Sequence, residues 1–205
     1  MISLQKRFLF VHVPKTGGNS IQGVLKQYSE DRIVADAPHQ DGIERFEIVN
    51  DRFRTHKHSS LAEYRNAMAP AVFASLYKFA VIRNPWDWMI SLYFSPHRGR
   101  SGWDPAAFRE VVDEAGTLRR YIRIEPGAGG PLDADIDFLM RFERLNDDFE
   151  AACESVGIPP EPLARRNQSQ REHYSNYYDD ALQALVAEKF HEEIAFGNYQ
   201  FEAAP

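Results

Sequence analysis

The fold is decided by the sequence Phe8-Leu9-Phe10-Val11-His12-Val13-Pro14-Lys15-Thr16-Gly17-Gly18-Asn19-Ser20. This stretch begins as an apolar run and then changes abruptly to small and polar residues. After it, the chain places apolar side chains at the spacing of one helix face, namely Ile21, Val24, Leu25 and Tyr28. The pattern predicts a buried strand, a glycine turn and a helix.

A strand that enters a helix through a tight glycine turn forms an anion-binding site. The first N–H groups of the helix have no partner within it, and the helix dipole adds positive potential there. Gly17 and Gly18 let the backbone approach an anion closely, and Lys15 adds a positive charge. The next short polar side chains, one of which can cap the helix, are Thr16, Asn19 and Ser20. We therefore predict phosphate or sulfate binding; the alternative is an ordinary turn that carries a lysine.

The loop is not a Walker A motif. A Walker A motif has four residues between its two glycines, and its second glycine is followed directly by Lys and then Ser or Thr. In this chain the lysine precedes the glycines. A P-loop kinase or NTPase also needs strand, loop and helix, so it is kept as an alternative. It predicts in addition an acidic Mg²⁺ ligand after a later strand.

Composition sets limits on the class of protein. The length of 205 residues suits one domain over residues 1–205. The net charge of −6 argues against a nucleic-acid or anionic-membrane binder, so an anion site must be local. The single cysteine, Cys153, excludes an intrachain disulfide and is interpreted as a core thiol. No apolar stretch approaches the ~20 residues that span a bilayer, and the N-terminus lacks a signal-peptide core. We expect a cytoplasmic protein.

A second strand is predicted over residues 77–83, and it ends in Arg83-Asn84-Pro85. Pro85 suits the first turn of a helix that Asn84 caps. Arg83 leaves the carboxyl end of its strand, as Lys15 does, and open α/β sheets bind ligands at that edge. We predict that Lys15 faces one part of a ligand, and that Arg83 and Ser91 face another. The alternatives are a surface ion pair for Arg83 and an inert position for Ser91.

Two histidines, His56 and His58, share a face of an extended segment. Zinc needs three or four ligands, and no nearby Cys or acidic pair completes a set, so we predict no metal site. His58 precedes a helix that Ser59 or Ser60 can cap. His12, in the apolar strand beside the loop, is the other histidine near the motifs.

The remaining elements are predicted as scaffold. Residues 29–44 indicate a loop, 46–49 a short strand, and 105–114 and 118–122 two helices. Asn146 is expected to cap another helix, and the spacing of apolar residues over 178–194 favours one long amphipathic helix. Together the elements predict a three-layer α/β fold with a central, mostly parallel sheet.

The two motifs resemble the sulfotransferase family, through Phe-Val-His-Val-Pro-Lys-Thr-Gly-Gly-Asn-Ser and through Phe-Ala-Val-Ile-Arg-Asn-Pro-Trp-Asp followed by Ser-Leu-Tyr. They are most similar to its bacterial and Golgi carbohydrate branch, which includes heparan sulfate 2-O-sulfotransferase. The resemblance implies a bacterial enzyme that uses 3′-phosphoadenosine 5′-phosphosulfate (PAPS). It assigns the 5′-phosphosulfate to Lys15, Thr16, Gly17, Gly18, Asn19 and Ser20, and the 3′-phosphate to Arg83 and Ser91.

The resemblance extends over residues 7–201. Lys57-His58-Ser59 lies where carbohydrate sulfotransferases place their histidine, which implies that His58 is the general base, with His12 as the alternative. Residues 138–145 resemble a later strand with an Arg-Phe-Glu signature, and residues 167–171 resemble an Asn-x-Ser-x-Arg loop. For Arg171 this implies a phosphate contact; the alternative is a solvated basic face with Arg165 and Arg166. Two departures are Asn19 for the usual Thr and Trp88 where Arg is common.

The resemblance implies transfer of a sulfuryl group from PAPS to a hydroxyl or amine, with a carbohydrate as the expected acceptor. Lys15 would stabilise the leaving charge, and the scheme needs no metal. The acceptor would be selected by the loops at residues 29–44, 95–104 and 124–134. A non-catalytic module that binds PAP, the desulfated cofactor, or a sulfated glycan is the other alternative.

Overall fold

The computed structural model describes residues 1–35, 46–95, 100, 102–164 and 171–204. Its central sheet has the strand order β1 (Ile2–Ser3), β2 (Phe8–Phe10), β6 (Tyr77–Ile82) and β7 (Phe138–Arg141). Strands β2, β6 and β7 run parallel, and β1 pairs antiparallel with β2. The predicted mostly parallel sheet is therefore confirmed.

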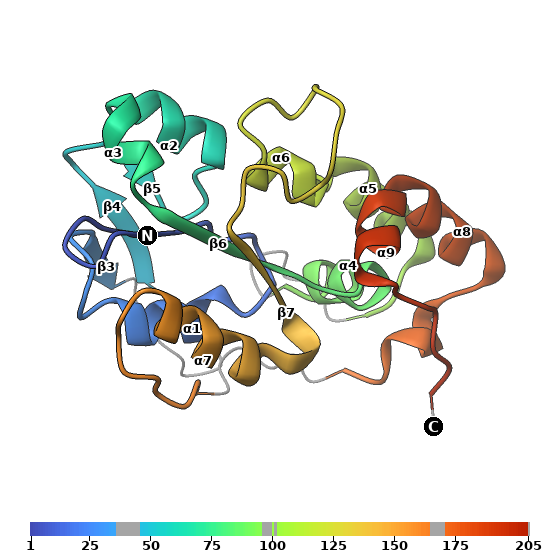
Figure 1. Ribbon diagram of the computed structural model, residues 1–205. Coiled ribbons are helices and arrows are strands. Elements are labelled where there is room, and N and C mark those ends of the chain that lie inside the picture. The colour runs from blue at the N-terminus through green and yellow to red at the C-terminus, as the bar shows by residue number, and fades with distance from the viewer. Residues whose placement is uncertain (36–45, 96–99, 101, 165–170, 205) are drawn as a thin grey trace.

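The strands of this sheet are apolar on both faces. Phe8, Phe10 and Phe79 pack on one face, with α1 (Gly18–Leu25) and α7 (Leu145–Ser155). Leu9 and Ala80 pack on the other face, with α2 (Leu61–Ala67), α4 (Pro85–Tyr93) and α5 (Pro105–Glu114). Successive side chains of a strand point to opposite faces, so a continuous apolar run requires cover on both sides. The result is the expected three-layer α/β arrangement, with α1 and α7 on one side of β6 and β7 (Figure 1).

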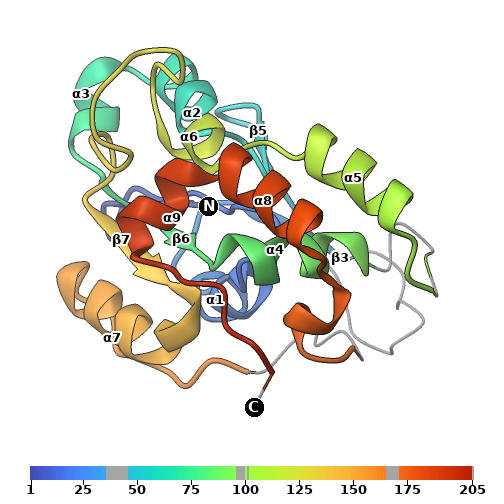
Figure 2. The same ribbon diagram turned by 90° about the vertical axis from the view of Figure 1, so that its right-hand side faces the viewer.

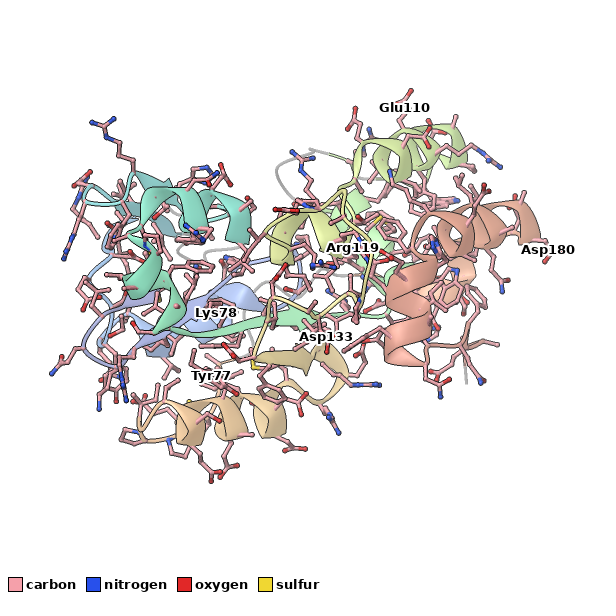
Figure 3. The ribbon with its side chains drawn as sticks, turned by 45° about the horizontal axis from the view of Figure 1, so that its top comes forward. Tyr77, Lys78, Glu110, Arg119, Asp133 and Asp180 are labelled. Atoms are coloured by element: carbon pink, nitrogen blue, oxygen red, sulfur yellow. The ribbon has the colours of Figure 1, made fainter. Side chains whose placement is uncertain are left out.

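The second helical layer also contains α3 (Pro70–Ala74), α6 (Leu118–Ile122), α8 (Asp180–Lys189) and α9 (His191–Gly197). Helices α5 and α8 pack against α4, and α9 packs against α8 (Figure 2). The outer sides of these helices are polar: Glu110 on α5 and Asp180 on α8 are exposed and point away from the molecule (Figure 3). Within the described ranges, no helix combines the length and the apolar character needed to cross a membrane.

A second, antiparallel sheet contains β3 (Arg32–Ala35), β4 (Phe46–Asn50) and β5 (Thr55–His56). Strand β4 confirms the prediction for residues 46–49. The prediction of a loop over residues 29–44 is wrong for β3, where Ile33 pairs with Ile48. This short strand depends on its partner across the sheet, which a local pattern does not reveal. Residues 36–45 lie outside the described part of the chain.

Two other expectations are corrected. The helix predicted over residues 178–194 is divided at Phe190, which ends α8 with φ −109° and ψ 30° and packs edge-on against Trp88. Asn146 does not cap α7, because the helix already begins at Leu145 and Arg144 occupies the cap position. The helices over residues 105–114 and 118–122 are confirmed. Cys153 is buried on α7, and burial raises the pKa of its thiol to about 11, as suits a core thiol.

The connector between α6 and β7 is held by two arginines. Arg119 donates to the carbonyl oxygens of Ala128 and Gly130 at 3.0 and 2.9 Å, and Arg123 donates to that of Pro131 at 2.7 Å. The glycine-rich segment is thus tied to α6 through its backbone.

Candidate functional site

The carboxyl ends of β2, β6 and β7 meet at one edge of the central sheet. Phe10 lies beside Phe79, and Ile82 lies beside Arg141 in the parallel registers. The chain leaves β2 toward Lys15, β6 toward Arg83 and β7 toward Phe142. The segments that follow the three strands are thus neighbours, at the edge where open α/β sheets bind ligands.

Residues 14–20, which we term the anion loop, turn through two left-handed positions. Lys15 has φ 64° and Gly17 has φ 86°; the first value is uncommon for a residue with a side chain. Gly17 occupies the N-cap of α1, and no side chain caps this helix. The expectation that Thr16, Asn19 or Ser20 caps it is therefore wrong. The hydroxyl of Thr16 instead donates to the carbonyl of Val13 at 2.9 Å and closes the loop from within.

The guanidinium group of Arg83 reaches from the second motif to this loop. Its Nη1 donates to the carbonyl oxygen of Lys15 at 2.7 Å, and its Nε donates to Asp87 at 2.8 Å. The guanidinium carbon lies 3.9 Å from the ring centroid of Phe142. Burial lowers the pKa of Arg83, while the Asp87 carboxylate opposes this shift and keeps the group charged. A buried cation is therefore fixed against the anion loop.

Arg171 approaches the same carboxylate and forms an ion pair with Asp87. Burial alone would raise the pKa of Asp87, but Arg83 and Arg171 outweigh it and hold the pKa of this carboxyl below its usual value. Two guanidinium groups therefore share the carboxylate of Asp87, and the Glu143 carboxylate also acts electrostatically on Arg83. Ser91 is buried one helical turn after Asp87, on the same face of α4. The other residues of the predicted basic loop, 165–170, lie outside the described residues.

His58 and His12 lie together beside the loop. Their ring centroids are 4.6 Å apart, and Nδ1 of His58 lies 3.0 Å from the carbonyl oxygen of His12. A carbonyl oxygen only accepts hydrogen bonds, so this contact requires the proton on Nδ1 of His58. In the neutral ring, Nε2 then carries the lone pair and can accept a proton.

His12 itself is buried under the loop. Burial, together with the neighbouring His58 and Lys57, holds the pKa of His12 well below its usual value, so the ring is neutral near pH 7. A Cβ added at Gly18 would lie 2.1 Å from Cδ2 of His12. Position 18 therefore requires glycine for close packing, a reason that differs from the positive φ at Gly17.

The sequence model of a family described as the Sulfotransferase family matches residues 1–199. The chain belongs to the sulfotransferase family. A solved sulfotransferase from Alicyclobacillus acidocaldarius is similar to it with 14% identity, covers 95% of this chain and 96% of its own, and gives a TM-score of 0.43. None of the curated proteins matches the chain. Membership of the family indicates sulfuryl transfer as the general reaction, and both motifs fall within the matched residues.

For a sulfotransferase, the polar side chains buried beside the anion loop are informative. Among the described residues, Asn19 Oδ1 is buried without a hydrogen-bond partner, and the buried polar side chains of His12 and Gln22 interact nearby. Leaving such a group unpaired costs about 1–3 kcal/mol, and proteins retain few of them. This edge of the sheet is therefore the candidate functional site.

At this candidate site, Asp87 and Glu143 were not singled out from the sequence, and Trp88 was noted only as a departure from the motif. Asp87 joins Arg83 to Arg171, and Glu143 accepts from the backbone N–H of Asn84 at 2.7 Å. Trp88 donates from Nε1 to the carbonyl of Pro14 at 2.8 Å. The spacing of Arg83 and Asp87, four residues apart at a helix start, could have indicated the first. The contacts of Glu143 and Trp88 join segments far apart in the chain, so the local sequence does not reveal them.

The structure shows no metal centre in this sulfotransferase over the residues that it describes. No group of three or more His, Cys, Asp or Glu side chains is placed to hold an ion there. His56 is exposed on β5, whereas His58 turns toward His12. The two histidines therefore have different environments although they are close in sequence.

Proposed function

We propose that this protein transfers a sulfuryl group from PAPS to a hydroxyl group of a carbohydrate acceptor, as in the carbohydrate branch that its motifs resemble. Transfer to an amine is the alternative within the same reaction class. The observation that carries the proposal is the hydrogen bond from Arg83 to the carbonyl of Lys15, because it joins two cationic motifs into one site.

A donor with two separate anionic groups suits this arrangement. The 5′-phosphosulfate would lie at the anion loop, against the N-terminus of α1 and the ammonium group of Lys15. The 3′-phosphate would lie at Arg83, Ser91 and Arg171, where two guanidinium groups lie together around the carboxylate of Asp87. Guanidinium forks pair well with phosphate oxygens, and buried pairs of this kind are strong.

We assign a role to each residue of the anion loop within this proposal. Gly17 and Gly18 would bring backbone N–H groups to the sulfonate and phosphate oxygens, and Asn19 and Ser20 would add polar contacts. Thr16 uses its hydroxyl proton within the loop, so its part in binding falls to its backbone. Lys15 would stabilise charge as it develops on the leaving phosphate.

His58 would act as general base for the acceptor. As its Nε2 takes the proton, the acceptor oxygen forms a bond to sulfur, and the bond from sulfur to the bridging phosphate oxygen breaks in line. The products are the sulfate ester, PAP and a protonated His58. The contact with His12 supports this assignment, because it keeps the proton on Nδ1 and leaves Nε2 as the basic nitrogen of the neutral ring. No step in this scheme requires a metal.

Ligand binding is tested first by thermal unfolding with PAP and with MgATP. We expect PAP to raise the melting temperature strongly and MgATP to leave it unchanged, since binding to the native state alone stabilises it. An equal or larger shift with MgATP would favour a P-loop kinase or NTPase. In the same assay, Arg83→Ala should reduce the rise in melting temperature that PAP causes. Its control is Arg32→Ala, which removes an exposed ion pair with Asp51.

Activity is tested with labelled PAPS and a panel of glycans, lipids, peptides and phenols. We expect label on a glycan hydroxyl and release of PAP in equal amount. Label on an amino sugar nitrogen would instead identify the protein as an N-sulfotransferase. Tight binding of PAP without transfer to any acceptor would favour a non-catalytic binding module.

A further inference from the structure

The resemblance of the motif implies an arginine where this chain has Trp88, and so suggests a change in charge on the acceptor side. The structure gives this side chain a different environment. It is 3% exposed, and its ring packs edge-on against Phe190 with centroids 5.5 Å apart. Because the ring belongs to the core around α4, it does not face an acceptor.

The indole nitrogen of Trp88 contacts the anion loop instead. Nε1 donates to the carbonyl oxygen of Pro14 at 2.8 Å, and the next carbonyl, that of Lys15, accepts from Arg83 at 2.7 Å. Two consecutive peptide groups are thus held by two side chains of the second motif. These bonds flank Lys15, whose left-handed φ of 64° is unfavourable for a residue with a side chain.

We propose that Trp88 is a positioning residue, which holds the backbone at Pro14 so that Lys15 and the N–H groups of the anion loop keep their reactive geometry. An indole has one donor and no acceptor, so a single carbonyl satisfies it in an apolar environment. An arginine at the same buried position would leave several donors unpaired. Trp88 thus supports the loop without placing a charge in the core.

This inference rests on the proposed function, and its test contains one measurement that does not. The principal variant is Trp88→Phe, which keeps an aromatic ring against Phe190 and removes the N–H. The matched control is Trp86→Phe on the same helix: Trp86 is 5% exposed, and its Nε1 donates to the carbonyl of Gln183 on α8 at 3.1 Å. Both variants lose one indole-to-carbonyl bond, but only the first loses a bond to the anion loop.

The measurement without ligand is amide hydrogen exchange over residues 15–22. We expect exchange in this segment to become about tenfold faster in Trp88→Phe and to stay unchanged in Trp86→Phe, as for the loss of one local hydrogen bond. Equal exchange in the two variants would overturn the positioning role. This result is independent of the identity of the donor or the acceptor.

The measurement with substrate is kcat and KM for PAPS. We expect kcat to fall about 10- to 100-fold in Trp88→Phe and less than about twofold in Trp86→Phe, because small displacements of catalytic groups cost rate. The melting temperatures of the two variants should fall by similar amounts. If the wild-type protein shows no transfer at all, the proposed function fails while the exchange result still stands. If wild type is active and the two variants are equally active, the role of Trp88 is overturned.

Should Trp88→Phe fold poorly, benzothienylalanine at position 88 provides the second variant. This amino acid keeps the two fused rings and replaces the N–H by sulfur, so packing is conserved and only the donor is lost. We expect the same faster exchange over residues 15–22 and the same fall in kcat. Wild-type values for both would contradict the proposal.

Discussion

Arg83 donates a hydrogen bond from Nη1 to the backbone carbonyl oxygen of Lys15 over 2.7 Å. The two residues follow different parallel strands and are 68 positions apart in the chain. Through this bond, the group proposed to hold the 3′-phosphate also supports the loop proposed to hold the 5′-phosphosulfate. Contacts of the donor at Arg83 would therefore affect the geometry of the anion loop at its other end.

Ser91→Ala should weaken PAP binding at least about tenfold, because the 3′-phosphate loses a charge-assisted hydrogen bond worth ~1.5–3 kcal/mol. Binding of adenosine 5′-phosphosulfate, which lacks the 3′-phosphate, should be unchanged. Arg83→Ala should weaken the binding of both ligands, because the Lys15 carbonyl also loses its donor. The loss should be larger for PAP. Calorimetric titration of both ligands checks this pattern. Equal losses of the two ligands in Ser91→Ala would show that Ser91 does not contact the 3′-phosphate.

Lys15→Ala should reduce turnover much more than it reduces PAP affinity. The ammonium charge matters most when the leaving phosphate develops charge, which occurs in the transition state and not in the bound product. Lys15→Arg should restore only part of the rate, because a planar fork does not replace a compact charge. Single-turnover rates and PAP dissociation constants are the measurements. If turnover and PAP affinity fell by the same factor, Lys15 would serve binding alone.

His58→Asn should lower kcat by about 10²–10⁴, the usual worth of a general base. The asparagine amide can still donate to the carbonyl of His12, so the variant separates the loss of a base from the loss of a local contact. The kcat of His58→Ala and of His58→Gln should fall by the same order, and their affinity for PAP should be nearly unchanged. The acidic limb of the pH–rate profile should flatten in all three. Near-normal turnover on the true acceptor would move the role of base to His12.

Asp87→Asn should destabilise the protein by about 3 kcal/mol at pH 7, because it leaves the buried cations Arg83 and Arg171 without their counter-ion. The pKa of Asp87 is lowered in the folded state, so the carboxylate stabilises the fold above the unfolded-state pKa of about 4 and loses this effect as the pH falls further. We expect the difference in unfolding free energy between Asp87→Asn and wild type to shrink below about pH 4. Urea unfolding from pH 7 to pH 3 measures it.

The control for this variant is Asp51→Asn, whose carboxylate is 75% exposed and pairs with the exposed Arg32. Its cost should stay below about 1 kcal/mol at every pH, as for surface pairs. Similar costs for the two variants would show that burial does not strengthen the Asp87 cluster.

Gly18→Ala should lower stability by about 1–3 kcal/mol and impair PAP binding, because the new methyl group would overlap the ring of His12 at 2.1 Å. Gly127→Ala is the matched control, since nothing lies within 4 Å of the position of its Cβ. Thermal unfolding with and without PAP measures both effects. Unchanged PAP binding in Gly18→Ala would indicate that His12 moves aside without disturbing the loop.

Local patterns determined the elements whose residues interact with near neighbours in the chain. The apolar run through Phe10 followed by glycines predicted β2, the anion loop and α1, and Asn84 before Pro85 predicted the start of α4, where Asn84 accepts from the N–H of Trp86. Ser60, one of the two serines expected to cap α2, does so and forms a capping box with Glu63. Periodicity and caps act over a few residues, so these features can be read directly.

The sequence by itself also predicted that Lys15 and Arg83 lie at one edge of the sheet, because parallel strands place their carboxyl ends there. Only the tertiary structure decided how they meet: through the Lys15 carbonyl, with Asp87 between Arg83 and Arg171, and with Trp88 bonded to Pro14. It also decided that β3 pairs in a second sheet and that His58 contacts the carbonyl of His12. The physical reason is that these contacts join segments far apart in the chain, and their geometry depends on the packing of all three layers.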